Sequence, residues 1–126
     1  MDDELHFLEI AELARLLAAR KVSPVELTRA MLDRIERLDP ALKSYAHVTP
    51  ELALAQARNA EQMIGRRQIL SQLHGVPIAV KDLCCTEGVV TSAGMSRHRD
   101  FVPALDATVV RKLREAGAVL LGKRQL

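Results

Sequence analysis

Aromatic residues are almost absent: the 126-residue chain contains two phenylalanines, one tyrosine and no tryptophan. Any core must therefore be built from leucine, isoleucine, valine and alanine. Modules that bind single-stranded nucleic acid stack bases on aromatic side chains, so this scarcity argues against that class. The net charge is only +2, from 18 basic and 16 acidic residues. This balance does not indicate a protein that binds phosphate backbones, and we expect no direct contact with nucleic acid.

Long apolar runs are also missing. No stretch approaches the roughly 20 apolar residues that a membrane span requires. The first four residues, Met-Asp-Asp-Glu, are acidic, whereas a secretory signal begins with a basic region. These absences predict a cytoplasmic protein without a membrane partner.

Cysteine and histidine do not occur at the spacing of metal ligands. The two cysteines, Cys84 and Cys85, are adjacent. Neighbouring cysteines rarely pair, and two alone do not make a zinc site, so we expect reduced thiols in or near packed structure. Of the four histidines, His74 stands just before a glycine and is interpreted as a loop residue with a local hydrogen bond. We therefore expect no metal site.

Helical signals dominate the first 70 residues. Apolar residues recur at helical spacing over residues 8–19. A second helix is predicted to start at Ser23, which is a good N-cap, with Pro24 in the first helical position and Glu26 completing a capping box. We expect Pro40 to stop this helix.

A strand and a third helix are predicted next. Residues 44–48 form a short strand candidate. Thr49 followed by Pro50 repeats the pattern of a cap and a proline, and the helix is predicted to run to about residue 64. Gly65 is the expected C-cap. Residues 66–74 indicate a polar loop.

The pattern changes after Gly75. Residues 76–80 are apolar and predict a buried strand. Residues 82–105 are irregular, residues 106–116 predict a helix, and residues 118–121 predict another strand, whose edge we expect to be open. Strand, crossover, helix and strand in this order indicate an α/β fold with a parallel or mixed sheet.

The helix over residues 106–116 has its own expected details. Asp106 is the predicted N-cap, and Gly117 is expected to end the helix. Val109, Val110 and Leu113 are expected on its buried face.

Lys81 stands directly after the apolar strand and before an aspartate. Alternation puts it on one face with Ala79. A lysine at a strand end is usually only solvated. The alternative is a lysine at the carboxyl edge of a sheet, where α/β enzymes place their chemistry and where a neutral lysine can act as a general base. The strand pattern alone leaves both interpretations open.

The segment Gly117–Lys123 has the spacing of a phosphate-binding loop, G-x-x-x-x-G-K. Arg124 follows, where a P-loop carries serine or threonine. The residues between the glycines form a predicted strand, whereas a P-loop lies between a strand and a helix. We therefore exclude nucleotide binding.

Several segments together resemble one family. Residues 73–82, LHGVPIAVKD, resemble a motif of the amidase-signature enzymes. Further matching segments follow in the family's order, and one precedes the motif: VSPVEL at 22–27, TSAG at 91–94, FVP at 101–103, DATVV at 106–110 and GAVLLGK at 117–123. The resemblance covers nearly the whole chain, and it favours a functional role for Lys81, which we expect to point into a cleft.

The resemblance implies a catalytic mechanism that needs neither a metal nor an organic cofactor. The lysine of the KD pair, here Lys81, belongs to a Ser–cis-Ser–Lys triad in that family. The uncharged lysine takes a proton through the bridging serine, and the second serine attacks a carboxamide carbon to form an acyl-enzyme. Both serines lie beyond residue 126 in the family. Ser71, Ser92 and Ser96 do not match their positions.

The family fold implied is α/β, with N-terminal helices followed by a mixed sheet flanked by helices. On this basis residues 1–70 are the helical lead-in, residues 71–126 begin the α/β core, and the chain is truncated before a Gly/Ser-rich segment.

Three functions stay open. The first is part of an amidase that acts on a small-molecule amide, alone or as a homodimer. The second is the glutaminase subunit of a tRNA-dependent amidotransferase, working with its partner subunits. The third is a catalytically inactive fragment that is at most an interaction module. Gln125 departs from the GKTN sequence usual in amidotransferase subunits, which favours a general amidase.

Overall fold

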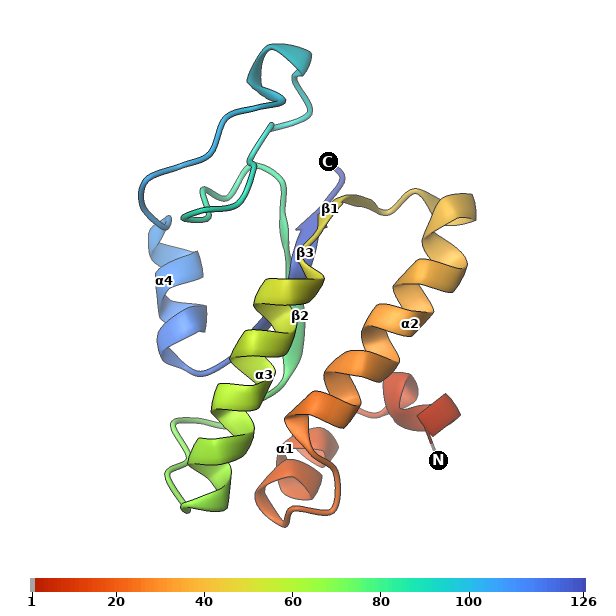
Figure 1. Ribbon diagram of the computed structural model, residues 1–126, viewed down its shortest axis with the longest axis vertical. Coiled ribbons are helices and arrows are strands. Elements are labelled where there is room, and N and C mark those ends of the chain that lie inside the picture. Colours follow the sequence, from red (N-terminus) through yellow and green to blue (C-terminus); the bar gives the residue numbers. More distant parts are fainter. Residues whose placement is uncertain (1) are drawn as a thin grey trace.

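The computed structural model describes residues 2–126. Helices and strands follow in the order η1 (Asp2–Phe7), α1 (Ile10–Ala18), α2 (Pro24–Leu42), β1 (Tyr45–Val48), α3 (Pro50–Gly65), β2 (Pro77–Lys81), η2 (Ser96–His98), α4 (Thr108–Glu115) and β3 (Val119–Arg124). The fold is α/β, as predicted, with a helical N-terminal part and a mixed sheet. Figure 1 shows α4 on one side of the strands and α2 on the other.

The three strands form one sheet in the order β1-β3-β2. β2 and β3 are parallel, whereas β1 pairs antiparallel with β3. The segment from residue 82 to α4 connects the parallel strands, as the sequence predicts. β3 is the central strand, because β1 returns to pair with its other edge. The expectation that β3 has an open edge is therefore wrong.

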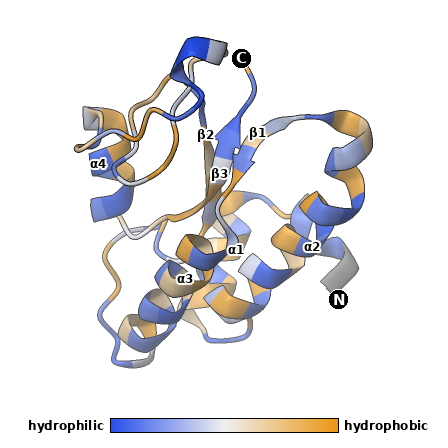
Figure 2. Cartoon of the chain, turned by 45° about the horizontal axis from the view of Figure 1, so that its top comes forward, coloured by the Kyte–Doolittle hydropathy of each residue, from blue (hydrophilic) through white to orange (hydrophobic). Residues whose placement is uncertain are grey.

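Aliphatic side chains fill the interior, as the scarcity of aromatics requires. One cluster packs α1 against the start of α2, with Leu13, Leu17 and Leu27 buried. A second joins Val119 and Leu121 of β3 to α2 and α3. In Figure 2 hydrophobic and hydrophilic residues alternate along α1, α2 and α3, as expected for amphipathic helices.

A third aliphatic cluster lies between the sheet and α4. It buries Val80 of β2, Leu120 of β3 and Val110 of α4. Leu113 is half-buried, but Val109 is 52% exposed. The prediction for Val109 is therefore wrong, because α4 directs Val110 rather than its neighbour toward the sheet.

The predicted start of α2 is confirmed. Ser23 is the N-cap, and its hydroxyl accepts the N–H of Glu26 at 2.9 Å. The helix continues through Pro40 to Leu42, so the predicted stop is wrong. Pro40 lacks the N–H that would bond to the carbonyl of Glu36, and the helix accommodates this loss in its last turn. Lys43 ends the helix instead, with a φ of 53°.

Three other predicted helix ends differ from the structure. Gly65 is still helical, and Arg67 takes the left-handed conformation. Thr49 occupies the N-cap position of α3, but its hydroxyl donates to the carbonyl of Leu120. Asp106 does not cap α4. Its carboxylate instead accepts hydrogen bonds from Arg114 and from the backbone of Glu87.

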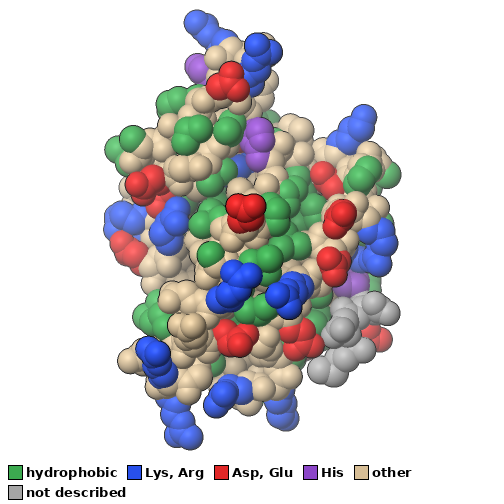
Figure 3. Space-filling view, in the orientation of Figure 1, with side chains coloured by type: hydrophobic (Ala, Val, Ile, Leu, Met, Phe, Trp, Pro, Cys, Tyr) green, Lys and Arg blue, Asp and Glu red, His purple; other side chains and the backbone are tan. Residues whose placement is uncertain are grey.

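Charged side chains of both signs intermingle on the face shown in Figure 3. This distribution accords with the small net charge of +2. Within residues 2–126, no helix is both long enough and apolar enough to cross a membrane.

Candidate active site at the carboxyl ends of β2 and β3

The parallel strands β2 and β3 end at the same edge of the sheet. Lys81, the last residue of β2, pairs with Arg124, the last residue of β3. The irregular segment 82–107 rises above this edge in Figure 1 before it descends into α4. Parallel sheets in α/β enzymes place their chemistry at this edge.

Lys81 occupies the predicted position at the end of a strand. Its side chain is exposed and has no hydrogen-bond or ion-pair partner among the described residues. The amine is thus free to meet groups that approach this edge. Its placement in a cleft stays a prediction.

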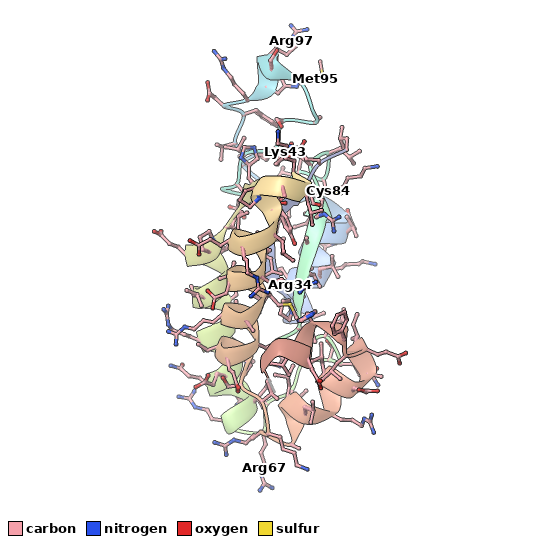
Figure 4. All side chains as sticks on the ribbon, turned by 90° about the vertical axis from the view of Figure 1, so that its right-hand side faces the viewer. Arg34, Lys43, Arg67, Cys84, Met95 and Arg97 are labelled. Atoms are coloured by element: carbon pink, nitrogen blue, oxygen red, sulfur yellow. The ribbon has the colours of Figure 1, made fainter. Side chains whose placement is uncertain are left out.

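A tight turn holds the backbone of Lys81. The N–H of Cys84 donates to the carbonyl of Lys81 at 3.0 Å, and the N–H of Asp82 donates to the carbonyl of Arg124 at 2.9 Å. Figure 4 labels Cys84 near the upper end of β2. Both cysteines are free thiols and half-buried, as expected.

Asp82 is the next side chain along the turn, and it is only 1% exposed. Its carboxylate accepts hydrogen bonds from the backbone N–H and the hydroxyl of Ser92. Its carbonyl accepts the N–H of Ala93 at 2.7 Å. The hydroxyl of Ser92 is therefore engaged by a carboxylate.

An irregularity in the pairing of β3 changes which face its last residues occupy. Ile78 pairs with Leu120 and Val80 pairs with Lys123, so β3 has one residue more than β2 between these pairs. A bulge of this kind redirects the side chains that follow it. Lys123 therefore shares the α4 face of the sheet with Val80 and Leu120, while alternation puts Lys81 on the other face.

Lys123 is completely buried, with 0% of its surface exposed. Its amine donates to the carbonyl of Cys84 and to the hydroxyl of Thr91, both at 2.7 Å. Burial lowers the pKa of Lys123, whereas the charge of nearby Asp82 opposes that shift. Lys123 and Asp82 are thus near each other, and they bind the consecutive residues Thr91 and Ser92.

The sequence pattern did not identify Lys123 as a site residue. In the sequence it belongs only to a false phosphate-loop match and to the last segment of the family resemblance. The predicted strand ended at Leu121 because the apolar run ends there, but β3 extends to Arg124. The usable signal is a lysine two positions after the apolar run 118–121. The bulge that turns it inward depends on pairing with β2.

His74 lies at the opposite end of β2, in the loop before the strand. It is buried, and its Nδ1 accepts the N–H of Leu70 at 3.0 Å. Burial lowers the pKa of His74. The predicted local hydrogen bond is confirmed. In the part of the chain that the structure describes, no group of His, Cys, Asp or Glu is arranged to hold a metal ion.

Comparisons with known proteins agree with the resemblance seen in the motifs. A family model described as Amidase matches residues 26–126. A Mycobacterium tuberculosis protein named "Putative amidase AmiD" is 54% identical over 122 residues, which are 97% of this chain and 26% of that protein. A glutamyl-tRNA(Gln) amidotransferase subunit of Methylococcus capsulatus is 51% identical over 94% of this chain and 24% of its own length.

A solved structure shows the same arrangement of elements. The native peptide amidase of Stenotrophomonas maltophilia superposes with a TM-score of 0.89 at 36% identity, over 94% of this chain and 24% of that chain. The chain thus spans about a quarter of the length of the curated relatives that it matches.

Proposed function

Because this chain belongs to the amidase family, we propose that it forms the N-terminal portion of an enzyme that hydrolyses a carboxamide C–N bond. Lys81 is the base of its Ser–cis-Ser–Lys triad. The observation that supports this role is the position of Lys81. Lys81 is the last residue of β2, at the carboxyl edge of a pair of parallel strands. Its amine has no partner among the described residues. The turn that follows is anchored by Asp82, whose side chain is buried and hydrogen-bonded.

The proposed reaction proceeds by nucleophilic catalysis. The neutral amine of Lys81 accepts a proton from a bridging serine, which takes a proton from the nucleophilic serine. The nucleophile bonds to the carboxamide carbon, and backbone amides stabilise the oxyanion. The C–N bond then breaks, the leaving nitrogen takes the proton and departs as ammonia or an amine, and water releases the acid. Both serines belong to positions after residue 126.

The first experiment is to read the coding sequence after Leu126. A continuing frame with a Gly/Ser-rich segment supports the proposal. A stop codon at that point contradicts it for this gene product and favours the inactive fragment. In the longer polypeptide, a fluorophosphonate reagent should label one serine after residue 126. Labelling of Ser71, Ser92 or Ser96 instead would overturn the proposed triad.

A second candidate function is the glutaminase subunit of a tRNA-dependent amidotransferase. The identity of 51% to a glutamyl-tRNA(Gln) amidotransferase subunit favours it, whereas Gln125, which departs from the usual GKTN sequence, favours a general amidase. A general amidase and an amidotransferase subunit differ in substrate and in their requirement for partner subunits. A general amidase, alone or as a homodimer, should release ammonia from small carboxamides. An amidotransferase subunit should release ammonia from glutamine when its partner subunits and charged tRNA are present.

A further inference from the structure

We propose that Lys123 is the positioning residue for Lys81. Its buried amine fixes the turn that carries the catalytic lysine, without touching the substrate. This inference rests on the proposed function of Lys81 as the base.

The two hydrogen bonds of Lys123 join parts of the chain that are distant in sequence. One reaches the carbonyl of Cys84, the last residue of the turn that starts at Lys81. The other reaches the hydroxyl of Thr91, which itself donates to the carbonyl of Val89. Lys123 therefore ties the end of β3 both to the turn after β2 and to the segment that runs over it.

Asp82 binds the same segment, at the residue next to Thr91. Its carboxylate binds Ser92, the residue directly after Thr91. The turn that begins at Lys81 is thus linked to residues 91–92 by two sets of hydrogen bonds, one through Lys123 and one through Asp82. If one set is lost, the turn gains freedom to move, and the amine of Lys81 moves with it.

A purely structural role explains the choice of lysine poorly. Burial of an amine has a desolvation cost, and apolar residues of similar volume often replace buried charges without loss of stability. Methionine has a similar length and could fill the same space. What methionine cannot do is donate to the carbonyl of Cys84 and the hydroxyl of Thr91. The specific contribution of Lys123 is therefore the geometry of the turn.

The test compares Lys123→Met, Thr91→Val and Lys123→Arg with the parent in the full-length protein. Small misplacement of a catalytic group can lower a rate about 100-fold. We expect Lys123→Met to lower kcat by about 10- to 100-fold with KM changed less than about 2-fold. Thr91→Val, which leaves the bond to Cys84, should have a smaller effect in the same direction. Lys123→Arg should retain more kcat than Lys123→Met, because it keeps donors.

Leu17→Ala is the matched control for lost stability, since Leu17 is buried in the N-terminal cluster. It should lower the melting temperature and leave kcat at a permissive temperature unchanged. If Lys123→Met folds and keeps its kcat, the inference is overturned. If Leu17→Ala lowers kcat as much, lost stability explains the effect and the inference also fails.

Amide hydrogen exchange gives a readout that does not need turnover. In Thr91→Val and in Lys123→Met, the amides of Cys84 and Ala93 should lose at least about 10-fold protection, while amides of α2 and α3 keep theirs. If the exchange rates of the Cys84 and Ala93 amides stay as in the parent, or if all amides lose protection equally, the positioning role of Lys123 is contradicted. Loss of kcat in Lys81→Ala with full kcat in Lys123→Met would overturn this inference alone. Retained kcat in Lys81→Ala would overturn the proposed function, whatever Lys123 does.

Discussion

Asp82 and Lys123, two buried side chains of opposite charge, bind consecutive residues of one loop. Asp82 accepts from Ser92, and Lys123 donates to Thr91. Each stands at the carboxyl end of one of two adjacent parallel strands. The loop after β2 is therefore held at one place by both strands, beside the exposed lysine that we propose as the base.

The N-cap of α2 should contribute measurably to stability. Ser23→Ala removes the acceptor of the Glu26 N–H and should lower the free energy of unfolding by about 1 kcal/mol. Ser23→Thr retains a hydroxyl and should recover most of that loss. Denaturant unfolding of the full-length protein measures both. An unchanged midpoint in Ser23→Ala would show that the cap contributes nothing.

Gly117 and Gly88 form a matched pair for backbone strain. Both have positive φ, but a Cβ on Gly117 would collide with the ring of His74, whereas a Cβ on Gly88 would have nothing within 4 Å. Gly88→Ala should cost only the left-handed strain of about 1–2 kcal/mol. Gly117→Ala should cost clearly more. Equal losses in thermal unfolding would contradict this packing.

Stability should fall as the pH decreases below about 6.5, in part because of His74. Burial lowers its folded pKa, so the unfolded chain takes up a proton first. The contribution of His74 to the free energy of unfolding is complete above its pKa in the unfolded chain and is lost as the pH falls through its pKa in the folded protein. Protonation would also remove the acceptor of the Leu70 N–H.

Melting temperature measured against pH tests the role of His74. His74→Gln should flatten the slope below a pH of about 6.5, whereas replacement of the exposed His98 by glutamine should not. Identical slopes for the parent and His74→Gln would assign the acid sensitivity to other groups.

Local signals were predictable from sequence, whereas features set by pairing were not. The capping box at Ser23 depends on residues within one turn of helix, and it is present as predicted. The predicted stop at Pro40 is wrong, because the helix continues through the proline to Leu42 at the cost of one backbone hydrogen bond. The burial of Lys123 depends on a bulge against β2 and on contacts with Cys84 and Thr91, which lie far earlier in the chain. No periodicity within β3 carries that information.

Residues 1–126 expressed alone should not hydrolyse amides, because both serines of the proposed triad are assigned to later positions. The polypeptide should also associate. β1 and β2 are the edge strands among the described residues, and Leu83, Leu105 and Val109 are exposed near the candidate site or on α4. Open edges and apolar surface favour pairing with other chains.

Size-exclusion chromatography, thermal unfolding and an amide assay test this expectation. A monomer that melts cooperatively would contradict the predicted association. Turnover above the buffer background would contradict the assignment of the serines.

The most direct test of the account is the steady-state hydrolysis of a small carboxamide by Lys81→Ala in the full-length protein. Lys112→Ala is the matched control, because Lys112 is an exposed lysine on α4. Removal of one member of a cooperating triad costs several orders of magnitude in kcat. We predict a loss of about 1,000-fold or more for Lys81→Ala and near-parental kcat for Lys112→Ala. Near-parental turnover by a folded Lys81→Ala variant would contradict the role of Lys81 as the base.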